Sequence, residues 1–218
     1  MAVAPSCAGA TVGGERKLCH PLSLTFDGPL THELAAQNPF LDFRLEVTFT
    51  SPSGKRVVVP GYYAADGDAA DSGATSGSRW RAHLTPDEIG RWTYEASFRS
   101  GPGVALGAEA NAGTAATFDG AAGSFTIAGS DKSAPDHRAR GLLQYVGENY
   151  LRFAGDGSYF LKGGADSPEN FLGYEEFDGT FDTKGNFLHA FEPHLADWRA
   201  GEPTWSGGRG RGIIGALN

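Results

Sequence analysis

The stretch DFRLEVTFT at residues 42–50 decides the fold class of this chain. Apolar and polar side chains alternate along it, and one face carries every apolar residue: Phe43, Leu45, Val47 and Phe49. A strand with one apolar and one polar face is typical of an antiparallel sheet that buries one side. We therefore predict a half-buried antiparallel strand here.

The same alternation recurs on both sides of this stretch. It is found in residues 22–26, 56–60, 79–84, 91–98 and 124–128. Turn signals rich in Gly, Pro, Asp or Ser separate these segments, including the Asp-Gly-Pro run at 27–29. The pattern predicts a mainly β chain with an immunoglobulin-like β-sandwich at 20–128. The segment before Arg91 is similar to the corner turn of such folds, with Trp92 where a tyrosine is common.

Composition narrows the class of partner. The chain has 218 residues, enough for one large domain or for a domain of about 100 residues plus part of another. Its net charge of −8 and its lack of a long basic stripe argue against a nucleic-acid partner. No apolar run approaches the ~18 residues of a membrane span, so no membrane partner is expected. The acidic balance favours neutral partners such as sugars.

The N-terminal arm, residues 1–19, holds both cysteines of the chain, Cys7 and Cys19. In an exported protein they would close a short loop as a disulfide, and in a cytosolic protein they would be free thiols. The arm lacks the basic start and apolar core of a signal peptide, so localisation stays open, with a secreted or periplasmic protein as the working expectation.

A polar connector at 129–140 separates the predicted sandwich from residues 141–218. There an apolar strand at 159–161 opens into a Gly-rich loop, and a short helix is expected at 187–198 and another from Ile213. An α/β barrel places its ligand-handling groups on loops of this kind. The chain ends inside the predicted second helix, so we expect residues 141–218 to be the first βα portion of an incomplete (β/α)8 barrel.

Candidate substrate-binding residues follow the 159–161 strand: Asp166, Glu169, Asn170, Tyr174 and Glu175. Their carboxylates and amide are suited to sugar hydroxyls, and the ring of Tyr174 to sugar C–H groups. Turn capping and an acidic solvated loop explain the same residues without any ligand. Asp166 and Glu169 lie too close together on one loop to form the carboxylate pair of a glycosidase.

Four further aromatic residues stand beside Gly, Pro or charged residues and are candidate stacking platforms: Tyr62, Tyr63, Trp198 and Trp205. Packing at a domain interface is the alternative for each of them. The six histidines show no metal-binding spacing, and the acidic runs lack the spacing of a calcium loop. We expect no metal and no cofactor.

Five segments resemble a known family. LSLTFDGP at 22–29, NPFLDFRL at 38–45, VPGYY at 59–63 and GRWTY at 90–94 are similar to a domain of unknown function that precedes glycoside-hydrolase barrels in bacterial polysaccharide-degrading proteins. FLKGGADSPENFL at 160–172 resembles the first strand and loop of those barrels.

The resemblance implies the N-terminal portion of a glycoside hydrolase acting on a polysaccharide or oligosaccharide. The sandwich would brace the barrel or extend its substrate cleft, and the partners would be a carbohydrate and the remaining C-terminal barrel. In such barrels the reactive carboxylates lie on the fourth and seventh strands, beyond this chain, so no catalytic residue is carried over. A non-catalytic carbohydrate-binding or adhesion module and a structural spacer are the alternatives.

Overall fold

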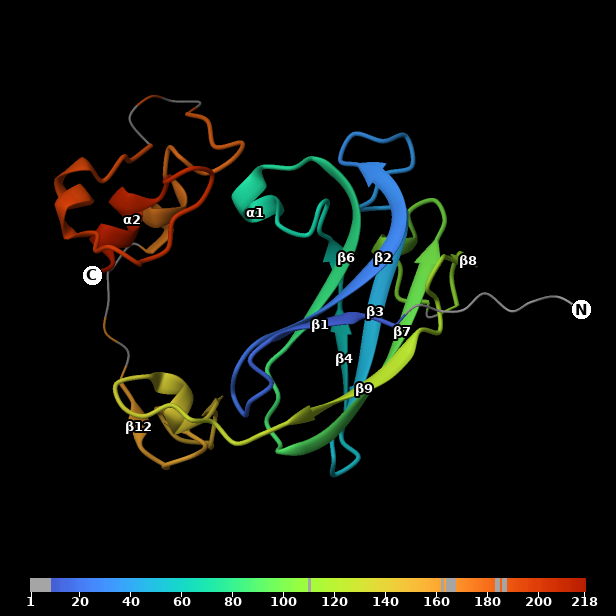
Figure 1. The fold of residues 1–218 in the computed structure, drawn as a ribbon, viewed down its shortest axis with the longest axis horizontal. Coiled ribbons are helices and arrows are strands. Elements are labelled where there is room, and N and C mark those ends of the chain that lie inside the picture. Colours follow the sequence, from blue (N-terminus) through green and yellow to red (C-terminus); the bar gives the residue numbers. More distant parts are fainter. Residues whose placement is uncertain (1–8, 110, 162, 164–167, 183–184, 186–187) are drawn as a thin grey trace, which may run out of the picture. The chain divides into compact units, whose positions relative to one another are not determined.

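The computed structural model describes residues 9–109, 111–161, 163, 168–182, 185 and 188–218. The chain is mainly β, and the named strands of the described part pair antiparallel in every sheet (Figure 1). The strands are β1 Thr11–Gly14, β2 Leu22–His32, β3 Phe43–Thr50, β4 Arg56–Pro60, β5 Tyr62–Tyr63, β6 Ser76–Leu84, β7 Gly90–Ser100, β8 Thr114–Ala115, β9 Ala122–Ile127, β10 Leu143–Gln144, β11 Leu151–Phe153 and β12 Tyr159–Phe160.

Helices are few and short. The α-helices are α1 Ala69–Ser72 and α2 Arg211–Ala216, and the 3-10 helices are η1 Val104–Leu106, η2 His137–Arg140, η3 Pro168–Leu172 and η4 Glu192–Asp197. The contacts between residues divide the chain into two compact units. The first unit contains residues 9–67 and 75–161, and the second contains 68–74 and the described residues from 163 onward.

Two antiparallel sheets form the main part of the first unit. One has the strand order β1-β2-β6-β5, and the other has the order β4-β3-β7, with both β8 and β9 paired to β7. The alternation of β3 is confirmed for its four apolar side chains, which are all buried, and for Glu46, Thr48 and Thr50, which are not. The same holds for β7, where the predicted inward residues are buried at every second position. Arg44 of β3, predicted on the polar face, is buried as well.

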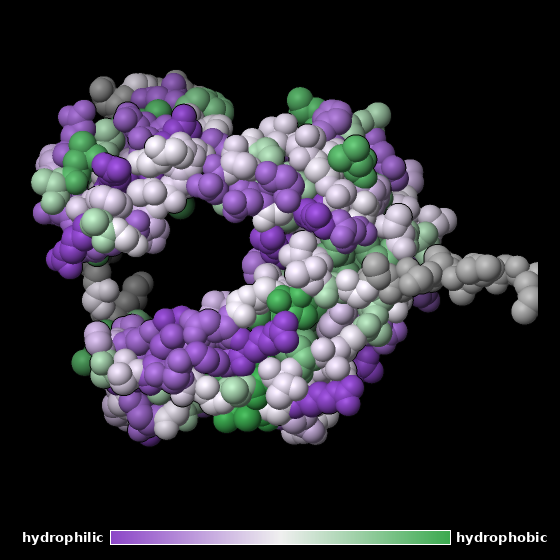
Figure 2. Space-filling view, in the orientation of Figure 1, coloured by the Kyte–Doolittle hydropathy of each residue, from purple (hydrophilic) through white to green (hydrophobic). Residues whose placement is uncertain are grey.

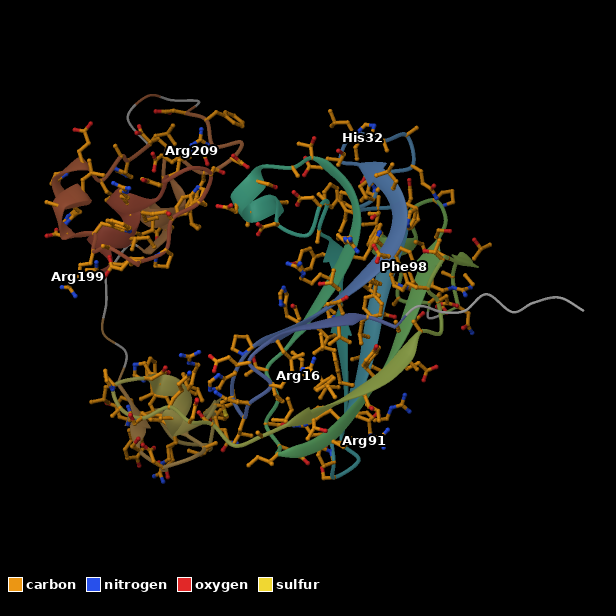
Figure 3. All side chains as sticks on the ribbon, in the orientation of Figure 1. Arg16, His32, Arg91, Phe98, Arg199 and Arg209 are labelled. Atoms are coloured by element: carbon orange, nitrogen blue, oxygen red, sulfur yellow. The ribbon has the colours of Figure 1, made fainter. Side chains whose placement is uncertain are left out.

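The core lies between the inner faces of these two sheets. Phe98 of β7 is fully buried and contacts the ring of Trp80 of β6 at 4.7 Å between centroids. Phe118, from the segment between β8 and β9, stacks on Phe98 at 4.1 Å and on Phe26 at 4.7 Å. Figure 3 shows Phe98 in the middle of the first unit, with Arg91 near one end. These rings bury large apolar surfaces, which makes them the main source of cohesion between the sheets.

The predicted turn at residues 27–29 is wrong, because β2 runs through it. The pairing of β2 with β6 shifts register between Asp27 and Thr31, which places a bulge there. Pro29 has no N–H to give to the ladder and is tolerated at such an irregularity. Gly28 is required for packing, since a Cβ at this position would lie 2.4 Å from Cδ1 of Trp80.

The corner before β7 is held by Trp92. Its indole N–H donates to the carbonyl of Glu88 at 2.9 Å, four residues back along the chain. The Glu88 carboxylate in turn accepts from the hydroxyls of Ser51 and Ser53. The hydrogen bonds of one acidic residue therefore tie the turn before β7 to the β3–β4 turn.

The connector at 129–140 is attached to the first unit by ion pairs. Lys17 contacts Asp131 at 2.5 Å, and Lys132 contacts Glu15 at 3.1 Å. Hydrogen bonds from these lysines lower the pKa of Glu15 to about 2. Strands β10, β11 and β12 follow as a small antiparallel sheet that also belongs to this compact unit, which ends at residue 161.

The second unit is built around an aromatic cluster. Tyr174 is 1% exposed and contacts the rings of Phe177, Phe191 and Trp205 at 5.4–6.1 Å. The helix predicted from Ile213 is present as α2, whereas the helix predicted at 187–198 is the 3-10 helix η4, and Phe187 lies outside the described residues. The close contact of α2 with η4 depends on glycine, since a Cβ on Gly215 would lie 2.0 Å from a backbone oxygen.

Surface colouring by hydropathy agrees with this division between interior and exterior. Figure 2 shows a surface that is mostly hydrophilic or neutral, with separate apolar patches. Among the described residues, none of the helices has the length and apolar composition needed to cross a lipid bilayer.

Candidate functional site

The first unit has a cavity of about 280 Å³ where the chain crosses from one sheet to the other. The crossing is made by Gly61, between the end of β4 in one sheet and the start of β5 in the other. A Cβ on Gly61 would lie 2.3 Å from Cδ2 of Leu45 and 2.9 Å from the carbonyl oxygen of Arg81. Only glycine fits this close approach, so the crossing and the cavity wall depend on one residue.

We call this the Tyr62 cavity, after an exposed tyrosine of its lining. Its lining residues are Pro39, Phe40, Phe43, Arg44, Leu45, Glu46, Pro60, Gly61, Tyr62, Tyr63, Trp80, Ala105 and Gly107. The volume is close to the lower end of the roughly 300–1,000 Å³ of typical small-molecule sites.

The ring of Tyr62 is 44% exposed and is held in place by His83. Its hydroxyl lies 3.0 Å from Nε2 of His83, and the two rings stack at 5.7 Å with an interplanar angle of 21°. Phe40, which is 50% exposed, adds a second aromatic ring to the lining. An exposed and oriented ring is a surface on which the C–H face of a sugar can pack, as predicted for this residue.

Arg44 and Glu46 supply the charge of the cavity. The side chain of Arg44 is 9% exposed, and its guanidinium donates to the carbonyls of Gly107 and Glu109 at 2.9 and 2.8 Å. Its Nε lies 3.9 Å from the carboxylate of Glu46, whose side chain is 38% exposed. Arg44 therefore anchors the loop after η1, and Glu46 presents an oriented acceptor for hydroxyl groups.

Sequence reasoning missed Arg44, Glu46 and Phe40. The two charged residues occupy polar positions of the 42–50 alternation, which is also the pattern of an ordinary solvated sheet face. The sequence did contain one indication of the site. The VPGYY segment at 59–63 follows this strand closely, and its aromatic pair directly after Gly61 indicates the edge of a sheet.

Tyr63 is not an exposed platform, which corrects the prediction. It is 6% exposed, and its hydroxyl donates to the carbonyl of Thr31 at 2.7 Å. Its ring packs against Trp80 at 5.3 Å. Burial raises the pKa of Tyr63. Adjacent residues of a strand point to opposite faces, so Tyr63 must enter the core when Tyr62 faces outward.

The predicted binding loop of the second unit is only partly described. Asp166 lies outside the described residues, whereas Glu169 and Asn170 are exposed on η3 and Glu175 is exposed. Tyr174 is buried, so its ring is unavailable for stacking on a sugar, which corrects that prediction. Of the described candidates, Glu169, Asn170 and Glu175 are exposed, and a binding role for them stays a prediction.

Tyr174 instead belongs to a hydrogen-bonded core. Its hydroxyl donates to Glu176, whose carboxylate also accepts from the amide of Gly210 at 2.7 Å. Burial raises the pKa of Tyr174 to about 12. Burial alone would also raise the pKa of Glu176, but the hydrogen bonds from Gly210 and Tyr174 outweigh it and lower that pKa.

The two C-terminal tryptophans are each half-buried. Trp198 lies under the guanidinium of Arg211, 4.5 Å from its ring centroid. Trp205 stacks on Phe177 at 5.6 Å and donates its indole N–H to the carbonyl of Glu176 at 3.3 Å. Both rings therefore have packing partners, and only part of each faces solvent.

The structure describes only one of the two cysteines, so it does not test the predicted disulfide. Cys19 is 8% exposed and has no disulfide partner among the described residues, and burial raises the pKa of its thiol. Cys7 lies outside the described residues, so the pairing stays a prediction. Within the part of the chain that the structure describes, no three His, Cys, Asp or Glu side chains are grouped so as to hold a metal ion.

Comparison with known proteins gives a domain family and one solved structure. The chain is mainly β, and its candidate site is a cavity with exposed aromatic side chains that is lined by residues of both antiparallel sheets. Residues 17–99 match the family model described as "Domain of unknown function (DUF5060)". No curated protein matches the chain.

The chain is also similar to a structure from Bacteroides vulgatus ATCC 8482 that is titled a "putative glycoside hydrolase". The identity is 22%, the TM-score is 0.42, and the match covers 66% of this chain and 20% of that one. The chain therefore spans about a fifth of the length of that protein.

Proposed function

We propose that the chain binds a polysaccharide or oligosaccharide through the Tyr62 cavity, as the N-terminal portion of a glycoside hydrolase. One observation carries the proposal: an exposed tyrosine ring, oriented by His83, lines the same cavity as the carboxylate of Glu46. Sugars present an apolar C–H face and a rim of hydroxyls, and this pair of groups is complementary to both.

The cavity is suited to binding and not to bond cleavage. Glycoside hydrolysis needs two carboxyl groups about 5–9.5 Å apart across the scissile bond. Glu46 is the one carboxylate among the described residues that line the cavity. The first unit would therefore hold or extend a saccharide chain, while reactive acids would come from the barrel that the resemblance implies.

The rest of the proposal concerns architecture. Residues 20–128 of the first unit would be an immunoglobulin-like β-sandwich, and the Trp92 hydrogen bond to Glu88 supports this because a corner residue bonding back to the chain is typical of those folds. Residues from 141 onward would begin a (β/α)8 barrel, with β12 as its first strand. In the described residues β12 pairs antiparallel with β11. A polysaccharide ligand favours a secreted or periplasmic protein.

The test is a glycan array probed with the 218-residue chain, followed by calorimetric titration of the best neutral oligosaccharide. Tyr62→Ala should weaken binding by at least ~10-fold, which corresponds to about 1.4 kcal/mol. Tyr62→Phe keeps the ring and loses only the bond to His83, so its affinity should stay within ~3-fold of the wild type, about 0.7 kcal/mol.

Tyr145→Ala is the matched control, because Tyr145 is 76% exposed and lies outside the cavity. It should bind like the wild type. Equal loss in Tyr145→Ala and Tyr62→Ala, or the absence of any glycan ligand, would overturn the proposal. Absence of a ligand together with a gain in stability of a longer barrel-containing protein would favour the structural spacer.

A further inference from the structure

The second unit contains a larger cavity that the proposed function does not use. Its volume is about 490 Å³, and its lining residues are Asp68, Ala70, Asp71, Phe177, Asp178, Thr204 and Trp205. We call it the Trp205 cavity. All its lining residues belong to the second unit, because the segment 68–74 that carries α1 is part of that unit.

The walls of the Trp205 cavity are fixed by packing and by backbone hydrogen bonds. Trp205 and Phe177 stack with an interplanar angle of 21°, and the indole N–H of Trp205 is bound to the chain. On the other side, the carboxylate of Asp71 accepts from the amide of Ser206 at 2.9 Å. The carbonyl of Asp71 also accepts from the Ser206 hydroxyl. The aromatic wall and the α1 segment are thus joined through adjacent residues, Trp205 and Ser206.

The charge of this cavity is one-sided. Three of its lining residues are aspartates, and none is a lysine or an arginine. Among the described residues, Asp178 has an ion pair with Arg209, whose Nη1 lies 3.9 Å from the carboxylate, and the Asp178 side chain is 71% exposed. A pair at that distance with so much exposure neutralises the carboxylate only weakly. The cavity therefore attracts cations.

The Trp205 ring beside the aspartates of the cavity indicates which kind of cation would bind there. The face of a tryptophan ring attracts an ammonium group or packs against a C–H surface. The described carboxylates do not group closely enough to hold a metal ion. The complementary ligand is an organic cation that has both an apolar ring face and an ammonium group, and an amino sugar has both.

We propose that the Trp205 cavity is a second saccharide site, selective for cationic amino-sugar oligomers. The sugar ring packs on the exposed part of Trp205, and its ammonium group pairs with Asp178 and Asp71. This site is separate from the Tyr62 cavity and recognises its ligand by charge, whereas the Tyr62 cavity takes a neutral sugar.

The experiment is calorimetric titration of the 218-residue chain with a tetramer of β-linked glucosamine. Two probes separate the parts of the ligand: the N-acetylated tetramer, which keeps the rings and loses the charge, and spermidine, which keeps the charge and has no ring. The glucosamine tetramer should bind at least ~10-fold more tightly than either probe, about 1.4 kcal/mol. Its affinity should fall at 0.5 M salt, because exposed charge pairs are screened.

Asp178→Asn is the decisive variant, since an exposed side chain can be changed without disturbing the core. It should weaken binding of the glucosamine tetramer by at least ~5-fold, about 1 kcal/mol. Glu33→Gln removes the same charge at an exposed position of the first unit and should leave the affinity unchanged. Trp205→Phe keeps an aromatic wall and should weaken binding less than Trp205→Ala.

Three results would overturn the inference. Equal binding of the N-acetylated tetramer would show that charge is not recognised, and equal binding of spermidine would show that the sugar is not. Unchanged affinity in Asp178→Asn would place the ligand elsewhere, even if Trp205→Ala simply fails to fold.

Discussion

Replacing Phe98 with alanine removes the ring at the centre of the two-sheet core. Phe98 is fully buried and contacts the rings of Phe118, Trp80 and Phe43 at 4.1, 4.7 and 5.7 Å. Truncating a buried Phe to Ala typically costs about 3–5 kcal/mol, from lost transfer free energy and from the cavity left behind. Three ring neighbours place this site in the upper part of that range, since each aromatic pair adds about 0.5–1.5 kcal/mol.

The assay is urea unfolding of the 218-residue chain followed by tryptophan fluorescence, which reports on Trp80 in the same core. The free energy of unfolding should fall by about 4 kcal/mol, a large share of the 5–15 kcal/mol of a typical domain. Phe181→Ala is the matched control, because Phe181 is 77% exposed, and its effect should stay within about 0.5 kcal/mol. A loss below about 1 kcal/mol for Phe98→Ala would refute the packing of the two sheets around this ring.

Two further predictions follow from the crossing and from the ion pairs. Gly61→Ala should lower the free energy of unfolding by about 1–3 kcal/mol, because the new Cβ meets Leu45 at 2.3 Å. Gly107→Ala is the control, because its Cβ meets nothing within 4 Å and should leave the free energy of unfolding unchanged. Equal effects of the two substitutions in urea titrations would contradict the close approach of Gly61 to Leu45. Hydrogen bonding to Lys17 is the main cause that lowers the pKa of Glu15 to about 2. The contribution of ionised Glu15 to the stability of the fold is therefore fully present above the unfolded-state pKa near ~4.3 and is lost as pH falls toward 2. Glu15→Gln should flatten the pH dependence of stability between those values, and an unchanged profile in acid titrations would argue against the pairing.

The strands were predictable because their information is local. Alternation at period two identified β3, β6 and β7 and the side chains they bury, and these were confirmed. The bulge in β2 was not predictable in the same way, since a Gly-Pro pair signals a turn unless a partner strand and a tryptophan ring hold the chain extended.

The candidate site was only half predictable. Tyr62 was identified from its setting, and the period of a strand already implies that Tyr62 and Tyr63 cannot both face solvent. The burial of Tyr174 could not be read locally, because its ring neighbours include Phe191 and Trp205, which lie 17 and 31 residues further along the chain. Arg44 was missed for the same reason, since its carbonyl partners are more than 60 residues away.

The central claim is that the Tyr62 cavity holds a saccharide. A crystal structure of the chain soaked with the best neutral oligosaccharide from the array tests it most directly. We predict electron density for a sugar ring packed on the face of Tyr62, with a hydroxyl within hydrogen-bond distance of the Glu46 carboxylate. A bound sugar elsewhere on the first unit, with the Tyr62 cavity unoccupied in the same crystal, would contradict the claim.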